Sequence, residues 1–134
     1  MLPVTVGAAG AARIVVREDN TASAMKSGSL PVLATPALIA LAEEASCEAM
    51  APYLEEDETT VGTKVDIAHT AATPIGCTVV ATAKIVEVHG REIVFSIVVE
   101  DNAGVVAEGT HSRFLVRQER FMEKAQKRLP SASA

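Results

Sequence analysis

Apolar β-branched residues concentrate in one early segment and through most of the second half of this chain, separated by turn residues, and over 61–69 they alternate with other residues with a period of two. This pattern predicts one early strand and four consecutive strands in the second half of the chain, over residues 11–17, 59–69, 76–88, 91–100 and 105–116. The connections between the last three strands are short enough for antiparallel hairpins. We therefore predict an antiparallel sheet of five strands.

One segment has a clear helical pattern. Thr35-Pro36 suits a helix N-cap and the first helical position, and strong helix formers follow from residue 37 to about residue 50. The preceding residues, 21–32, contain Ser, Gly and Pro and predict a lid-like loop with room for one short helical turn. A long helix wrapped on one side by a five-stranded antiparallel sheet is an α+β architecture.

Composition narrows the classes of function. The 134 residues are 49% apolar, 22% charged and only 3% aromatic, with a net charge of −5. This balance predicts a single domain over residues 1–134, with a basic amphipathic tail from about 119 to 134, and disfavours binding to nucleic acid or anionic membranes. No signal peptide or membrane-spanning stretch is predicted, and the two cysteines lack the paired spacing of a zinc site. We expect a cytoplasmic protein with reduced thiols and no metal.

The small side chains of the predicted core bear on assembly. Alanine and valine dominate the apolar residues, so each buried residue removes little apolar surface from water. A sheet covered by one helix also leaves an open face and unpaired edge strands. We expect a homodimer, possibly extended to a tetramer, with a monomer of polar outer face as the alternative.

Among the carboxylates of the predicted helix, Glu43 is unusual. Glu44 and Glu48 share a face that is typical of a solvated surface, whereas Glu43 lies beside the predicted apolar stripe formed by Leu38, Ala42, Ala45 and Ala49. A carboxylate near an apolar face is costly to bury unless it is paired, so such positions are enriched in functional groups. The alternative is a side chain at the stripe's edge whose carboxylate reaches water.

A threonine and a histidine complete the set of candidates. Thr35 precedes Glu43 by eight positions, slightly over two turns, so the two side chains project from neighbouring sectors of one side of the helix. Thr35 either caps the helix or contacts a substrate. In the second case, free amides over 35–38 would bind the oxyanion of that substrate. His69 continues the predicted inward face of its strand, which consists of Val61, Thr63, Val65 and Ile67. An inward histidine is either a satisfied core residue or a general base. His89 is expected to be exposed in a turn, and His111 shares a strand face with Arg113.

Four stretches carry a resemblance to a known family. They are residues 49–55 (AMAPYLE), 61–63 (VGT), 69–76 (HTAATPIG) and 108–111 (EGTH), followed by Arg113. In order and spacing they resemble the fluoroacetyl-CoA thioesterase family of the hot-dog fold, and the resemblance extends from about residue 34 to residue 124.

The resemblance implies a fold, an assembly and a site. It implies a helix wrapped by an antiparallel sheet, and a homodimer whose sheets join side by side with acyl-CoA thioesters bound at the interface. The family's Thr-Glu-His triad falls on Thr35, Glu43 and His69, and its acyl-contacting Gly and Arg fall on Gly62 and Arg113. The implied function is an acyl-CoA thioesterase that needs no cofactor beyond the CoA of its substrate.

Two other functions fit the same fold. One is an enoyl or hydroxyacyl thioester hydratase, and the other is an acyl-CoA-binding module without turnover.

One departure from the family bears on the substrate. The fluoroacetyl-specific enzyme has a gate of phenylalanines around the helix start, whereas this chain has Lys-Ser-Gly-Ser at 26–29 and no Phe before Phe95. We therefore expect a different or broader acyl preference.

Overall fold

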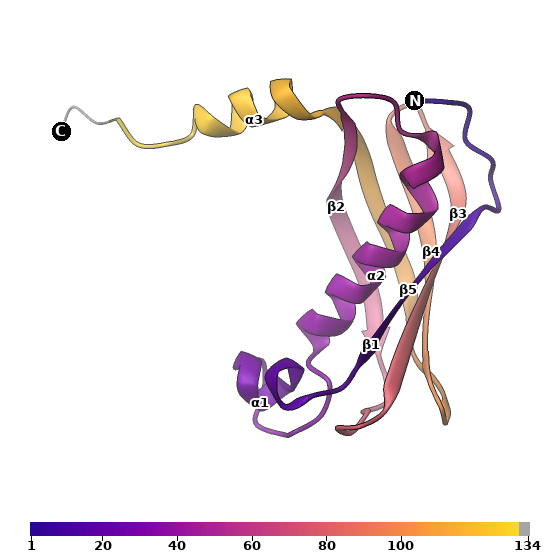
Figure 1. The fold of residues 1–134 in the computed structure, drawn as a ribbon, viewed down its shortest axis with the longest axis vertical. Coiled ribbons are helices and arrows are strands. Elements are labelled where there is room, and N and C mark those ends of the chain that lie inside the picture. Colours follow the sequence, from indigo (N-terminus) through magenta and orange to yellow (C-terminus); the bar gives the residue numbers. More distant parts are fainter. Residues whose placement is uncertain (132–134) are drawn as a thin grey trace.

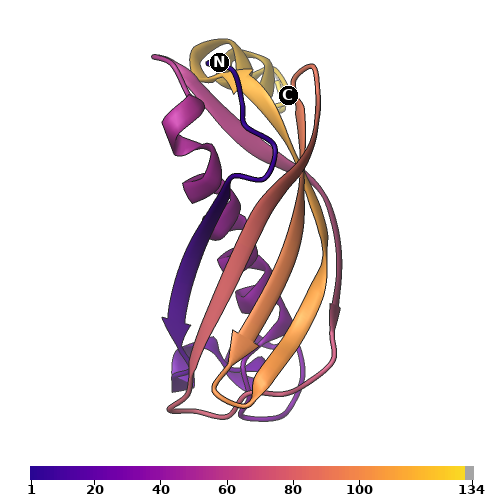
Figure 2. The ribbon, with the colours of Figure 1, turned by 90° about the vertical axis from the view of Figure 1, so that its right-hand side faces the viewer.

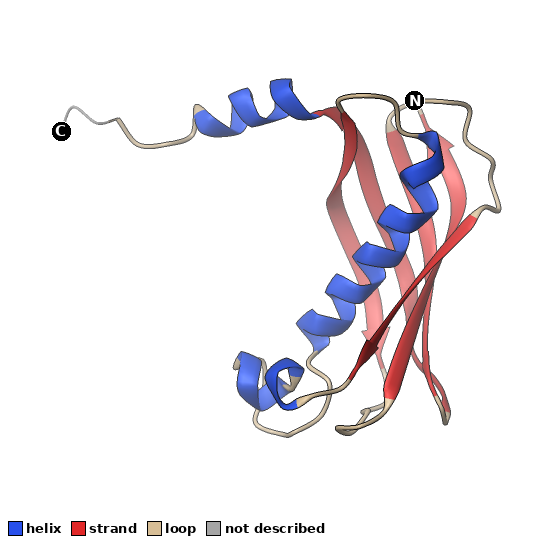
Figure 3. Cartoon of the chain, in the orientation of Figure 1, coloured by secondary structure: helices blue, strands red, loops and turns tan. Residues whose placement is uncertain are grey.

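A five-stranded antiparallel sheet curls around one long helix in the computed structural model, which describes residues 1–131 (Figures 1 and 3). The strand order across the sheet is β1-β3-β4-β5-β2. The strands are β1 (Ala9–Val15), β2 (Glu58–His69), β3 (Thr78–His89), β4 (Glu92–Asp101) and β5 (Gly104–Arg117), and the long helix is α2 (Thr35–Met50). The predicted sheet and helix are therefore confirmed; the largest displacement of a strand boundary is at β1 and β3, where it reaches two residues.

The core lies between α2 and the β1, β3 and β4 strands. Alternate residues of β3 and β4 are fully buried, and Leu38, Ala42, Ala45 and Ala49 of α2 are buried against them, as the apolar stripe predicts. Gly10 of β1 shows how closely the layers approach, because a Cβ atom there would overlap the backbone of Ala45 and Ala49. Small residues at this contact therefore let α2 pack closely against the β1 and β3 strands.

Figure 2 shows β1 and β3 in front of α2, and towards β2 the helix covers the inner face of the sheet less well. β2 pairs only with β5, so β2 forms one free edge of the sheet and β1 forms the other. Val65 in the middle of β2 pairs with the inward-facing His111 and is still 40% exposed. An apolar side chain left open on the inner face beside a free edge is a surface that a second copy of the chain would cover.

Residues 18–33 form a small lobe at the N-terminal end of α2. It contains a 3-10 turn, η1 (Glu18–Asn20), and one short helix, α1 (Ala22–Met25), as the predicted loop with a helical turn allows. An isolated β-bridge from Thr21 to Leu33 closes the lobe, and a second one from Val32 to Pro74 connects it to the segment between β2 and β3.

The predicted basic tail contains a helix, α3 (Gln118–Gln126), which projects away from the rest of the chain (Figure 1). A short 3-10 turn, η2 (Ala51–Tyr53), follows α2. Residues 132–134, the end of the expected tail, lie outside the described residues. Within residues 1–131 no helix is both long and apolar enough to cross a membrane.

Candidate active site

A threonine and a histidine meet at the N-terminal end of α2. The hydroxyl oxygen of Thr35 lies 2.8 Å from Nδ1 of His69, although the two residues are 34 positions apart in sequence. Thr35 is the first residue of α2, whereas His69 is the last residue of β2. The prediction that Thr35 caps the helix is wrong, because Ala34 occupies the N-cap and the Thr35 hydroxyl bonds the imidazole instead.

The first turn of α2 offers fewer free amides than the sequence suggests. The amide of Leu38 donates to the carbonyl of Ala34, and Pro36 has no N–H. The amides of Thr35 and Ala37 remain, at the positive end of the helix dipole and beside the Thr35 hydroxyl. An oxyanion would therefore be bound by two amides rather than by a full helical turn.

The second nitrogen of His69 has no protein partner. Nε2 is buried and makes no hydrogen bond within residues 1–131. A hollow of 230 Å³ lies at this end of β2, lined by His69, Thr70, Ala71 and Ala72. A buried polar nitrogen is costly to leave unpaired, so a water, a substrate or a second copy of the chain is expected to satisfy it.

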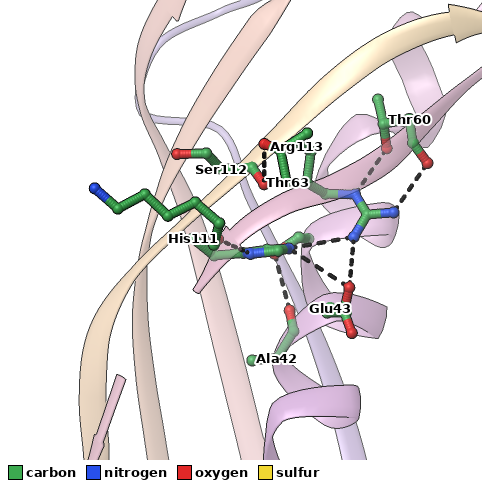
Figure 4. Close-up of polar contacts among 9 residues, drawn as sticks. Ala42, Glu43, Thr60, Thr63, His111, Ser112 and Arg113 are labelled. Atoms are coloured by element: carbon green, nitrogen blue, oxygen red, sulfur yellow. Dashed lines mark hydrogen bonds and ion pairs between the residues drawn. The ribbon is translucent and has the colours of Figure 1, made fainter. Parts of the chain in front are cut away.

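Glu43 belongs to a second polar group in the middle of α2 (Figure 4). Its carboxylate oxygen Oε2 accepts a hydrogen bond from Nη1 of Arg113 at 3.2 Å. The Arg113 guanidinium is itself buried and donates through Nε and Nη2 to the hydroxyl and carbonyl oxygens of Thr60, each at 2.9 Å. Glu43 remains 40% exposed. The arginine is thus rigidly held, and it orients a carboxylate that solvent or a ligand can still reach.

His111 completes this group, and sequence reasoning did not include it among the site residues. Nδ1 of His111 lies 2.8 Å from the carbonyl oxygen of Lys64, so Nδ1 must carry the proton and donate it. Nε2 then accepts from Nη1 of Arg113 at 3.2 Å, and Oε2 of Glu43 is 4.0 Å away. Two signals could have included it: the strand face that His111 shares with Arg113, and its place in the EGTH stretch that resembles the family.

The protonation state of His111 predicts a pH dependence. Burial, together with the nearby Arg113 charge, lowers the pKa of His111 from its ordinary value of 6.5, although the Lys64 carbonyl and Glu43 act in the opposite direction. The unfolded chain therefore binds a proton that the folded chain rejects, and the free energy of unfolding should fall as pH drops below 6.5 towards the folded-state pKa. H111N, whose amide can still donate to Lys64, should flatten this slope in denaturant titrations between about pH 5 and 7.5. H89N is the exposed control and should retain the slope; an unchanged slope in H111N would contradict the assignment.

Gly62 lies directly beside Glu43. A Cβ atom on Gly62 would come within 2.6 Å of Oε2 of Glu43 and 3.3 Å of Nη1 of Arg113. The sheet register changes between Gly62 and Lys64, which marks a β-bulge at Thr63. The predicted inward face is therefore wrong for Val61 and Thr63, because the bulge shifts the alternation. Before it, the residues facing α2 are Thr60 and Gly62. After it, Val65, Ile67 and His69 face inward as predicted.

G62A should displace the Glu43 carboxylate while leaving the fold intact. The added methyl group meets the movable end of a side chain rather than backbone, so the thermal midpoint should change little. A displacement of about 1 Å at a reacting group lowers rates roughly 100-fold, so we expect kcat/KM for a thioester substrate to fall by about 10- to 100-fold. G28A, which meets only the Ala22 side chain at 3.3 Å, is the matched control. Equal kinetics for both variants would remove Gly62 from the site.

The predicted site residues fall into two groups within one chain. Thr35 and His69 form one group, and Glu43, Gly62 and Arg113 form the other, joined by His111. Among the described residues no hydrogen bond or ion pair links the groups. Eight residues of helix separate Thr35 from Glu43, which corresponds to about 12 Å along the axis. Within residues 1–131 no three His, Cys, Asp or Glu side chains gather as metal ligands would.

The fold and this arrangement define a protein of the hot-dog fold. A Thermus thermophilus hypothetical protein described as a thioesterase superfamily member superposes with a TM-score of 0.88 over 95% of this chain and 94% of its own, at 22% identity. The family model of FlK, the fluoroacetyl-CoA-specific thioesterase, matches residues 16–119. The chain therefore belongs to the fluoroacetyl-CoA-specific thioesterase family, and the sequence-based identification of a thioester hydrolase is confirmed.

Two relatives show the extent of this similarity. The fluoroacetyl-CoA thioesterase of Streptantibioticus cattleyicolor is 39% identical over 100 residues, which are 75% of this chain and 72% of that protein. A solved structure of the fluoroacetyl-CoA thioesterase FlK has a TM-score of 0.89 and 34% identity, and covers 96% of this chain and 99% of its own. Two other structures of that enzyme carry a substituted threonine, one in complex with fluoroacetate and one with acetyl-CoA.

Proposed function

We propose that this protein hydrolyses the thioester bond of small acyl-CoA substrates and releases the free acid and CoA. The observation that carries the proposal is the 2.8 Å contact between Thr35 and His69 at the N-terminus of α2, with Nε2 of the same imidazole buried and unpartnered. A hydroxyl, an imidazole and free amides at one place are the groups that acyl transfer requires. The relatedness to fluoroacetyl-CoA thioesterases supports the same conclusion.

His69 acts as the general base in this proposal. It removes a proton from water, or from the Thr35 hydroxyl, as the oxygen adds to the carbonyl carbon. The amides of Thr35 and Ala37 stabilise the oxyanion that forms. The carbon–sulfur bond then breaks, and the proton held by the imidazole passes to the thiolate or to solvent. Because a thiolate is a good leaving group, little acid catalysis is needed. Attack by Thr35 would instead form an acyl-enzyme that water hydrolyses in a second step.

Glu43 orients the attacking water or attacks the carbonyl carbon itself. Arg113 binds the Glu43 carboxylate, and Gly62 leaves room beside it for the acyl group. Since about 12 Å of helix separates Glu43 from Thr35 in one chain, we place the two groups at one site through a homodimer. Two copies joined edge to edge along β2 would cover the open inner face around Val65, and would bring Thr35 and His69 of one copy to a common seam with Glu43 of the other.

The acyl group we propose is small but not restricted to fluoroacetyl. Residues 26–29 form a turn after α1 in which Lys26 has a left-handed backbone (φ 59°), and no aromatic side chain stands there. Selection of a fluorinated acyl group by aromatic contacts therefore has no support in this part of the chain. We expect kcat/KM for acetyl-CoA and other short acyl-CoA esters to equal or exceed that for fluoroacetyl-CoA.

A panel of acyl-CoA esters tests the proposal. Thiol release is measured with a thiol reagent for fluoroacetyl-CoA, acetyl-CoA, longer saturated esters and one enoyl-CoA, beside a thermal-shift assay with each ligand. Release of CoA from several esters is the expected result. Conversion of the enoyl ester without thiol release would indicate a hydratase, and stabilisation without turnover would indicate a binding module. A strong preference for fluoroacetyl-CoA over acetyl-CoA would contradict the proposed acyl range alone.

A further inference from the structure

Helix α3 has an apolar side that its own chain leaves uncovered. It is attached at the end of β5 and by hydrogen bonds from Gln118 and Glu119 to Asp57 and Glu58, and none of its residues is buried. Phe121 and Met122 are 39% and 51% exposed. A groove of 410 Å³ lies between α3 and the end of β5, lined by Phe114, Val116, Phe121, Lys124, Ala125 and Arg128. An isolated helix of nine residues is marginal in water, so a further surface is needed to hold it.

The charge of this segment differs from that of the rest of the chain. Residues 117–128 contain five of the twelve Lys and Arg residues and two Glu, which gives a net charge of +3. The whole chain carries −5, so the remainder carries −8. A basic helix attached to an acidic domain favours contact with an acidic surface.

One acidic surface lies at the end of β2 opposite to α3. The β2 exit end, defined here as residues 66–75 and 100–108, contains Asp66, Glu100, Asp101 and Glu108 and neither Lys nor Arg. Ile75 and Val105 at this end are 50% and 47% exposed. The β2 exit end thus combines negative charge with uncovered apolar side chains, as a counterpart of α3 would.

Within one chain the topology keeps α3 and the β2 exit end apart. In a dimer of two chains it brings them together. α3 begins at the start of β2, where Arg117 pairs with Glu58 and the Gln118 amide donates to the Asp57 carbonyl. Antiparallel pairing of two β2 strands about their midpoint places Glu58 of one copy opposite His69 of the other. The first turn of α3 then lies at the β2 exit end of the second copy.

We propose that α3 of each copy packs on the β2 exit end of a second copy, with Arg120 and Lys124 facing Asp66 and Glu108 and Phe121 facing Val105. This rests on the edge-to-edge dimer of the proposed function. In that arrangement each chain contributes a helix that covers the β2 exit end of its neighbour.

Charge exchange between the two surfaces tests the inference. The dimer dissociation constant is measured by analytical ultracentrifugation without substrate, so the result does not depend on thioesterase activity. R120E/K124E and D66K/E108K should each raise the dissociation constant about tenfold or more, because each reversal places like charges in contact at both symmetric interfaces. The quadruple variant should return within about threefold of wild type, since the charges again alternate across the contact. R13E/K84E, which reverses two exposed cations on β1 and β3, is the matched control and should behave as wild type.

A second measurement locates the contact. Carbodiimide, which joins lysine amines directly to carboxylates, should link Lys124 or Lys127 to Asp66 or Glu108 between isotopically labelled and unlabelled copies. A wild-type dimer that R120E/K124E leaves intact would overturn the role of α3 but not the edge pairing, whereas a monomeric wild type would overturn both. A variant that remains dimeric but has a raised KM for acyl-CoA would overturn the inference by showing that α3 binds the phosphates of CoA instead.

Discussion

H69A is expected to lower kcat/KM for acyl-CoA hydrolysis by about 10²- to 10⁴-fold, the effect of removing a positioned general base. The imidazole hydrogen-bonds the Thr35 hydroxyl, and its Nε2 is a buried nitrogen without a hydrogen-bond partner in residues 1–131. Steady-state thiol-release assays at saturating and limiting substrate would show the loss mainly in kcat, because the proton transfer occurs in the transition state.

H89A is the matched control for this experiment. His89 is an exposed histidine at the end of β3 whose Nε2 lies 3.2 Å from Oε2 of Glu87. Its replacement removes the same side chain without touching either polar group of the site, so kinetics should match those of the wild type. If H69A retains activity within about threefold of wild type, far below the effect of a positioned base, His69 is not the base and the proposed chemistry fails.

E43Q is expected to lower kcat by about 10²-fold or more while leaving the fold intact. Glutamine keeps an oxygen that can accept from Arg113, and the guanidinium retains both of its bonds to Thr60. What is lost is the negative charge that could orient water or attack the carbonyl carbon. E44Q, one residue along α2 on the exposed face, is the control and should be unaffected.

Mixing H69A with E43Q tests whether the His69 and Glu43 of one active site come from the same chain or from two chains. In a mixed dimer of H69A and E43Q, a site built from His69 of one copy and Glu43 of the other would contain both wild-type groups at one of its two positions. Mixing should therefore restore a substantial part of wild-type activity. Failure of complementation in proven mixed dimers would show that Glu43 and His69 act from the same chain.

Local sequence patterns were sufficient to predict the strands and the long helix of this fold. Runs of β-branched residues bounded by turn residues located all five strands, and the Pro36-containing start with its run of helix formers located α2. The stripe of Leu38, Ala42, Ala45 and Ala49 faces the core as the 100° geometry predicts, and Glu44 and Glu48 are exposed. These features depend on side-chain spacing along one segment, which the sequence states directly.

The site was predictable only in part, because its geometry depends on contacts between segments. Alternation alone placed Val61 and Thr63 on the inner face, but a bulge at Thr63 moves Gly62 and Thr60 there instead. Thr35 is a residue type that commonly caps helices, yet its hydroxyl forms a hydrogen bond with His69 of another element. No local signal marks either event.

The sequence by itself determined the strands, the helix, its buried stripe and, through motif resemblance, the family, and it proposed Thr35, Glu43, His69, Gly62 and Arg113 as candidate site residues. Only the tertiary structure decided that these residues form two groups, that His111 joins Arg113 and Glu43, and that α3 extends away from its own chain. The reason is physical: periodicity records which side of an element a residue occupies, whereas hydrogen bonds between β2, β5 and α2 arise from register and packing, which no single segment encodes.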